Sequence, residues 1–196
     1  ILQQRLEFIQ KVVENKPFTV IVTVDAFLDK IQPLEKIKDN YIEIDSEDRR
    51  KEITNVVYER LLELDNYLLD QLYNGDVSTS KFILVYAIAK NDSLFFDFMF
   101  EVYRDALLSE GKYISIDDFD LFFASKKESD HIVSTWGHFT LDQLAKGYRN
   151  ILVDSGLGHR VKRTIAVTKA MVHPEVQEHI ALIHDREYLQ ALLGED

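Results

Sequence analysis

The feature that most constrains the fold is an uninterrupted run of eight apolar residues, FILVYAIA, at positions 82–89. A membrane-spanning helix needs about 20 apolar residues, so this run is too short to cross a bilayer. A helix that is apolar on every side is usually the central, buried one. Only three prolines and seven glycines are available for tight turns, which favours helices over a many-stranded sheet. We therefore predict a soluble, mainly α-helical protein that folds as a compact bundle around this run.

Helical patterns flank the buried run on both sides. Ser46 has the character of an N-cap, and apolar residues stay on one face through residue 72, which predicts one helix of more than 20 residues. Residues 74–76 should close it, and Thr79 or Ser80 should open the buried helix. Residues 94–108 predict a helix whose many aromatic rings lie mostly in the core.

Before residue 46 the pattern is less decisive. Residues 2–13 have apolar positions at helical spacing and predict an amphipathic helix. Residues 18–24 are rich in β-branched side chains, so they fit either a short strand or the first turns of a buried helix, and periodicity does not choose between the two.

The last third of the sequence carries strong local signals. Asp130 should cap a helix that begins at residue 131, and Thr140 a longer helix that ends near Val153. Two glycines within residues 155–158 should stop that helix in the left-handed conformation. Alternation between residues 161 and 172 predicts a small β-ribbon, and Pro174 should begin the final helices.

The polar run at residues 125–130 is the best site for a domain boundary. It would separate a helical N-terminal domain, residues 1–124, from a C-terminal subdomain, residues 130–196. The order helix, turn, helix, ribbon and helix in the second part is that of a winged-helix-like element, in which one helix enters a DNA groove and the ribbon touches phosphates.

Charge singles out one part of that subdomain. Between Lys146 and Lys169 there are six cations and one anion, a formal charge of +5 in a chain whose total is −11, which leaves −16 on the other residues. A basic element on an acidic body suggests contact with a polyanion at one place. A solvated hairpin without a partner is the alternative that charge alone leaves open. The predicted DNA-binding residues are Lys146, Arg149, His159, Arg160, Lys162, Arg163 and Lys169, with Thr140, Gln143 and Asn150 on the exposed side of the helix.

Other kinds of site have weaker support. The chain has no cysteine, which excludes disulfides, zinc–thiolate sites and thiol nucleophiles within it. The six histidines show no pair at the i, i+4 spacing of a helical metal site. Asp117, Asp118 and Asp120 could hold Mg²⁺ in a nuclease, but at a helix start, beside Ser115, we expect them to act as caps. We therefore predict no catalytic residue, no metal and no cofactor, and a protein that is not an enzyme.

The order of these residues resembles the BrxA family, small accessory proteins of the BREX bacteriophage-exclusion systems that are often labelled inner-membrane proteins. The resemblance covers roughly residues 46–194. Its motifs are Arg60-Leu61-x-x-Leu64, Asn74-Gly75-Asp76, Tyr86-Ala87-Ile88-Ala89-Lys90, Phe98-x-x-Glu101-Val102-x-Arg104, Trp136-x-x-x-Thr140-x-x-x-Leu144, Ser155-Gly156-Leu157, Pro174 and Tyr188-Leu189-x-Ala191-Leu192-Leu193-Gly194.

The resemblance implies a mainly helical bundle similar to the NusB type that binds double-stranded DNA beside the other BREX proteins. We expect such a protein in the cytoplasm and without contact to a membrane. The alternative is a scaffold that binds a protein of the defence complex and never contacts DNA.

Overall fold

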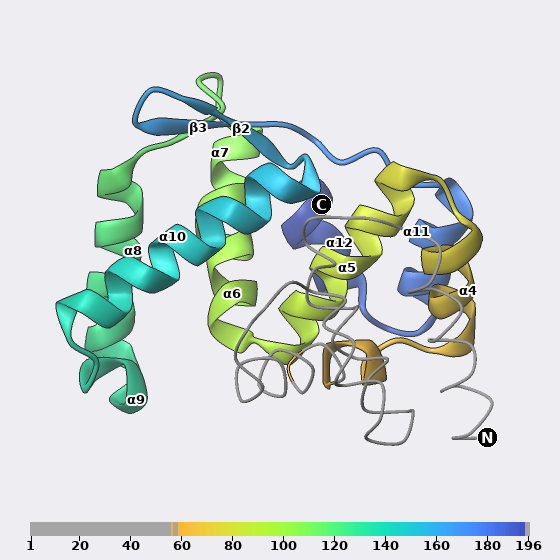
Figure 1. The fold of residues 1–196 in the computed structure, drawn as a ribbon, viewed down its shortest axis with the longest axis horizontal. Coiled ribbons are helices and arrows are strands. Elements are labelled where there is room, and N and C mark those ends of the chain that lie inside the picture. Colours follow the sequence, from red (N-terminus) through yellow and green to blue (C-terminus); the bar gives the residue numbers. More distant parts are fainter. Residues whose placement is uncertain (1–55, 57–58, 195–196) are drawn as a thin grey trace, which may run out of the picture. The chain divides into compact units, whose positions relative to one another are not determined.

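The computed structural model describes residue 56 and residues 59–194, which are mainly helical with one small antiparallel sheet (Figure 1). This confirms the predicted fold class, while the likeness to the NusB type stays a prediction. The chain divides into two compact units between Asn91 and Asp92. The elements expected at residues 2–13 and 18–24 lie outside the described residues.

Each of the two units has its own set of helices, and the second unit also contains the sheet. In the described part of the first unit, helical residues 59–62 are followed by α4 (Asn66–Asn74) and α5 (Val77–Asn91). In the second unit they are α6 (Ser93–Phe98), the π-helical segment η3 (Met99–Tyr103), α7 (Arg104–Leu108), β1 (Tyr113–Ile114), α8 (Ile116–Ser129), α9 (His131–Ser134), α10 (His138–Ser155), β2 (Gly158–Val161), β3 (Thr164–Val167), α11 (Pro174–Leu182) and α12 (Arg186–Leu193).

The apolar run is confirmed as the centre of helix α5, because every residue from 82 to 89 is buried. The prediction that Thr79 or Ser80 opens this helix is wrong. The Asp76 carboxylate takes the capping role, since it accepts hydrogen bonds from the backbone N–H groups of Ser78 (2.9 Å) and Thr79 (3.0 Å) and from the Thr79 hydroxyl (2.6 Å). The Thr79 hydroxyl holds the pKa of Asp76 below its ordinary value, so the cap is charged at neutral pH.

The single helix predicted to reach residue 72 is interrupted at residues 63–65. There the Asp65 carboxylate accepts a hydrogen bond from the backbone N–H of Leu68 at 2.9 Å and starts α4 as a new helix. Leu61, Leu64 and Leu68 are all buried, so the apolar pattern continues across the break and periodicity does not reveal it. Residues 46–55, which contain the expected Ser46 cap, lie outside the described part. Gly75 ends α4 as predicted.

The second unit is built on the aromatic helix predicted at residues 94–108, which α6, η3 and α7 form together. Its residue Phe98 is fully buried. The Phe98 ring centroid lies 4.9 Å from Phe119, 5.5 Å from Phe122 and 5.2 Å from Tyr148. Since the first two rings belong to α8 and the third to α10, this ring cluster packs both helices against the same turn of the aromatic helix.

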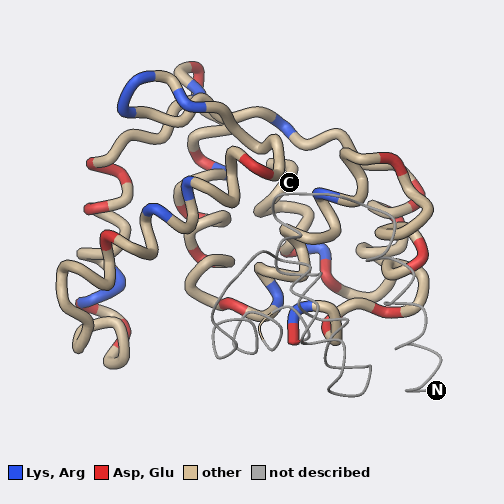
Figure 2. The backbone as a smooth tube through the Cα atoms, in the orientation of Figure 1, with Lys and Arg blue, Asp and Glu red and all other residues tan. Residues whose placement is uncertain are grey.

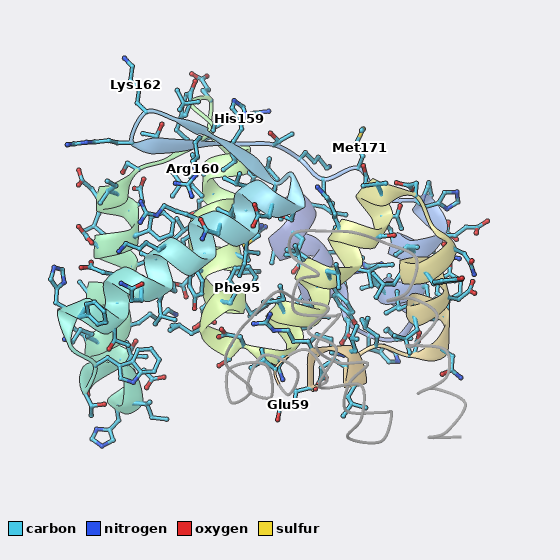
Figure 3. The ribbon with its side chains drawn as sticks, viewed as in Figure 1. Glu59, Phe95, His159, Arg160, Lys162 and Met171 are labelled. Carbon is cyan, nitrogen blue, oxygen red and sulfur yellow. The ribbon has the colours of Figure 1, made fainter. Side chains whose placement is uncertain are left out.

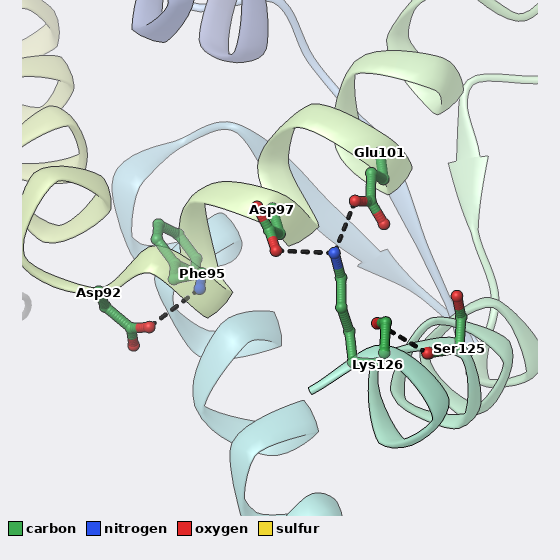
Figure 4. A network of polar contacts seen from close by, with 7 residues as sticks. Asp92, Phe95, Asp97, Glu101, Ser125 and Lys126 are labelled. Atoms are coloured by element: carbon green, nitrogen blue, oxygen red, sulfur yellow. Dashed lines mark hydrogen bonds and ion pairs between the residues drawn. The ribbon is translucent and has the colours of Figure 1, made fainter. Parts of the chain in front are cut away.

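A polar contact holds α8 to the same helix (Figure 4). The Lys126 ammonium donates to Asp97 at 2.7 Å and to Glu101 at 2.6 Å. Burial alone would lower the pKa of Lys126, but the hydrogen bonds and charges of the two carboxylates raise it above its ordinary value. The ammonium is therefore charged at neutral pH, and its contribution to stability is lost only as the pH rises through that raised pKa.

The sheet has the strand order β1-β3-β2, and both pairings are antiparallel. The predicted ribbon is confirmed at β2 and β3, but residues 170–172 form no strand. The sequence pattern does not predict the two-residue strand β1, because its partner β3 lies about 50 residues further along the chain. The Tyr103 hydroxyl donates to the Thr168 carbonyl at 2.8 Å and joins the end of β3 to the aromatic helix.

Caps define the helices around the sheet. Ser115 caps α8 as predicted and forms a capping box with Asp118, and Asp130 caps α9 as predicted. The prediction of Thr140 as the cap of α10 is wrong, because the helix begins earlier and its cap residue is Gly137. Gly156 ends α10 at a φ of 82°, the predicted left-handed stop. Residues 125–129, where we predict a domain boundary, are the last turns of α8, and that boundary stays a prediction.

Two buried tyrosines provide a matched test of hydrogen bonding. Within the described residues the Tyr148 hydroxyl is buried without a hydrogen-bond partner, whereas that of Tyr103 has one. We expect Tyr148→Phe to keep or raise the free energy of unfolding and Tyr103→Phe to lower it by about 1 kcal/mol. Urea unfolding monitored by circular dichroism measures both. If Tyr148→Phe lowered the free energy of unfolding more than Tyr103→Phe, the assignment of a hydrogen bond to Tyr103 and of none to Tyr148 would be wrong.

The Lys126 contact is also testable by substitution. Lys126→Met keeps the apolar stem but removes both ion pairs. Because the carboxylates are 40% and 46% exposed, we expect a loss of only about 1 kcal/mol in the free energy of unfolding. Lys112→Met, at an exposed position, is the control and should change stability by less than about 0.5 kcal/mol. Equal effects of the two substitutions in urea unfolding would argue against a structural role for Lys126.

Candidate nucleic-acid interface

Helix α10 has one buried face and one exposed face. Tyr148 and Leu152 are buried against the rest of the second unit. Gln143, Lys146 and Asn150 are exposed and follow one another at intervals of three and four residues, so they share the opposite face. The helix therefore presents a row of one cation and two amides to solvent.

The β2–β3 hairpin carries three more cations, Arg160, Lys162 and Arg163, and the last two form its two-residue turn. Both are exposed, and Figure 3 shows the Lys162 side chain projecting away from the hairpin. Lys162 has a φ of 54°, in the left-handed region where a non-glycine residue is strained. A lysine at such a position holds a positive charge at the outermost point of the hairpin, at the expense of local backbone stability.

The two faces of the hairpin differ. Arg160 pairs with Ile165, whose side chain is buried, so Arg160 lies on the inner face of β2. Its guanidinium donates to the Asn150 side-chain oxygen of α10 at 2.6 Å. His159 is the neighbouring residue in the strand and lies on the outer face, as Figure 3 shows.

Arg149 is only partly exposed. Its Nε donates to the Ala145 carbonyl at 3.1 Å, and its guanidinium carbon lies 5.8 Å from the centre of the Phe119 ring. These contacts hold Arg149 against α8, so it is the least available of the predicted DNA-binding cations.

The structure thus divides the predicted set into groups. The Arg160–Asn150 contact brings the hairpin to the Lys146 face of α10, while Lys162 and Arg163 lie at the turn. His159 lies on the outer face of the hairpin, and Lys169 is exposed beyond the end of β3. Figure 2 shows the lysine and arginine positions along α10 and the hairpin.

Two features of this region carry no clear sequence signal. The Arg160–Asn150 hydrogen bond depends on the register of β2, which a single sequence does not reveal. Phe139 is 75% exposed in the first turn of α10, although an aromatic residue at a helix start is ordinarily expected in the core.

The predicted capping by the acidic residues at the start of α8 is confirmed for Asp118. Over residues 59–194, no group of three or more histidine, aspartate and glutamate side chains is placed to hold a metal ion. No helix in the same range combines the length and the hydropathy that a membrane span requires.

Comparison with known proteins decides the family. The family model for BrxA matches residues 29–183. The chain belongs to the BrxA family. One relative, the BREX protein BrxA of Bacillus cereus (strain H3081.97), is 33% identical over 159 residues, which are 81% of this chain and 80% of the relative.

A solved structure has the same fold. The crystal structure of an uncharacterized protein from Magnetospirillum magneticum superimposes with a TM-score of 0.71, at 18% sequence identity, over 94% of this chain and 98% of the other. At this identity the likeness concerns the fold alone.

The strained turn allows stability and charge to be tested separately. Lys162→Gly should raise the free energy of unfolding by about 1 kcal/mol, because glycine adopts the left-handed conformation without a steric penalty. Arg163→Gly removes the same charge from the adjacent residue, which has no positive φ, and should leave stability unchanged or lower it by about 0.5 kcal/mol. Thermal and urea unfolding of the pair measure the difference. The strain would be refuted if both variants lost stability alike.

Proposed function

We propose that this BrxA-family protein binds double-stranded DNA through α10 and the β2–β3 hairpin. The observation that carries the proposal is the group of exposed cations formed by Lys146 of α10 and by Arg160, Lys162 and Arg163 of the adjacent hairpin, in a chain with a net charge of −11. The acidic remainder would repel DNA elsewhere and so orient the duplex toward this one surface.

The topology supports a winged-helix arrangement. The chain runs from the aromatic helix through β1, α8, α9 and α10 into the hairpin, and the strands have the order β1-β3-β2. In such an arrangement α10 is the recognition helix that enters the major groove, and the β2–β3 turn is the wing that reaches the neighbouring phosphates.

The exposed side chains then have distinct roles. Lys162 and Arg163 neutralise phosphates from the wing, and Lys146 does so from α10. Gln143, exposed on the same face as Lys146, has the amide that reads an adenine edge. Arg160 gives one N–H to Asn150 and keeps further donors for a phosphate, so its first role is to hold the wing against the recognition helix. Arg149 mainly supports the packing of α10, while His159 and Lys169 extend the basic surface at its margins.

The relative from Bacillus cereus is named as a BREX protein, which supports a place for this chain among the accessory proteins of a BREX phage-defence system. Its partners would then be the other BREX proteins and DNA, in the cytoplasm. No step of catalysis is assigned to it. A scaffold that binds only proteins is the second candidate, and the exposed apolar side chains of the second unit favour it.

Fluorescence anisotropy with a labelled 20-base-pair duplex tests the proposal. The triple variant Arg160→Glu, Lys162→Glu, Arg163→Glu should bind at least tenfold more weakly than the unmodified protein at low salt. Arg186→Glu, an exposed position on α12, is the control and should change the affinity less than threefold. With about four phosphate contacts, the logarithm of the binding constant should fall with a slope of about −4 against the logarithm of salt concentration.

Two results would count against this proposal. If the triple variant bound as tightly as the unmodified protein, the assigned residues would be wrong. If the unmodified protein bound no duplex even at low salt, the scaffold function would replace DNA binding.

A further inference from the structure

A second surface of the same unit has the opposite charge. A groove of about 420 Å³ lies between the aromatic helix, strand β1 and helix α8. Its wall and floor include Val102, Ala106, Ile114 and Phe122, and its carboxylates are Glu101, Asp105 and Asp118. The groove thus combines an apolar base with acidic side chains.

Large apolar side chains at this groove are exposed to solvent. Leu121 on α8 is 69% exposed, and Tyr113 on β1 is 54% exposed. Both line the groove, so they form one apolar surface and are not scattered positions. Such a surface is stabilised when another apolar group covers it.

The acidic side chains keep capacity for a further cation. Glu101 and Asp105 are four residues apart, both line the groove, and both are exposed. One Glu101 oxygen accepts from Lys126, and the Asp118 carboxylate serves the capping box. A polyanion such as DNA would be repelled here, whereas a lysine or arginine side chain would be attracted.

The backbone of the wall is itself unusual. Glu101 and Val102 belong to the π-helical segment η3, and π turns within α-helices are rare and frequent at functional sites. Here the turn places an acidic and an apolar side chain of consecutive residues in the same groove.

We propose that this groove binds a basic amphipathic helix of another protein. The apolar face of that helix would cover Leu121 and Tyr113, and its lysine or arginine side chains would pair with Glu101 and Asp105. Charge complementarity selects this occupant over nucleic acid. The inference does not depend on DNA binding, because it concerns other residues.

Labelled synthetic peptides test the proposal on the whole chain. The probe is a 15-residue peptide with leucine and lysine at helical spacing, compared with a peptide of the same composition in scrambled order and with a version that carries glutamate for lysine. By fluorescence anisotropy, the leucine–lysine helix should bind at least tenfold more tightly than either control peptide. Raising the salt concentration should weaken the binding of the leucine–lysine helix.

Variants locate the site. Asp105→Lys combined with Leu121→Ser should reduce the affinity for the leucine–lysine peptide at least tenfold. Leu182→Ser, on α11 and 76% exposed, is the matched control and should leave it unchanged. Leu121→Ser alone should leave duplex DNA binding unchanged, which separates this proposal from the DNA-binding function.

Three outcomes would overturn the inference. The first is that the three peptides bind with equal affinity, or that none of them binds. The second is unchanged peptide affinity in the double variant. The third is a dimer in sedimentation velocity that Leu121→Ser converts to a monomer while the peptide fails to bind, which would make a second copy of this chain the occupant.

Discussion

The packing of Phe98 is the interaction on which the second unit depends. One buried ring contacts Phe119 and Phe122 of α8 and Tyr148 of α10, so the aromatic helix fixes both of these helices at once. Because Tyr148 must face this cluster, the opposite side of α10 must face solvent. The exposure of Lys146 on that opposite side is therefore a direct result of core packing.

The aromatic helix also fixes the sheet and both proposed surfaces. The Tyr103 hydroxyl holds the chain just after β3, and the Arg160–Asn150 contact joins β2 to α10. The same helix supplies Glu101 and Asp105 to the acidic groove. The basic surface and the acidic groove thus both depend on the packing of the aromatic helix. The two proposed functions therefore concern separate surfaces of one unit.

Features that depend on neighbouring residues could be predicted from the sequence. The buried run in α5, the Ser115 capping box and the left-handed stop at Gly156 each follow from a few consecutive side chains. The basic surface could be located for the same reason, since charge is counted along the chain. The break at Asp65 could not be predicted, because the apolar pattern runs across it without a change of phase.

Features that depend on distant residues could not be predicted. Strand β1 has only two residues, too few for an alternation pattern, and exists because β3 pairs with it. The division of the cations between two faces of the hairpin depends on the Arg160–Ile165 register. The apolar side chains at the groove, such as Leu121, follow a helical pattern that ordinarily predicts burial. Only the fold shows that no described element covers them.

Hydrogen–deuterium exchange with and without a duplex tests the central claim most directly, because it maps the contact surface over the whole chain without any substitution. The account predicts slower exchange in the first turns of α10 and across the β2–β3 turn on addition of DNA, and no change at η3 or the N-terminal half of α8. Slower exchange at η3 and α8 on addition of DNA, with unchanged exchange at the hairpin, would contradict the account.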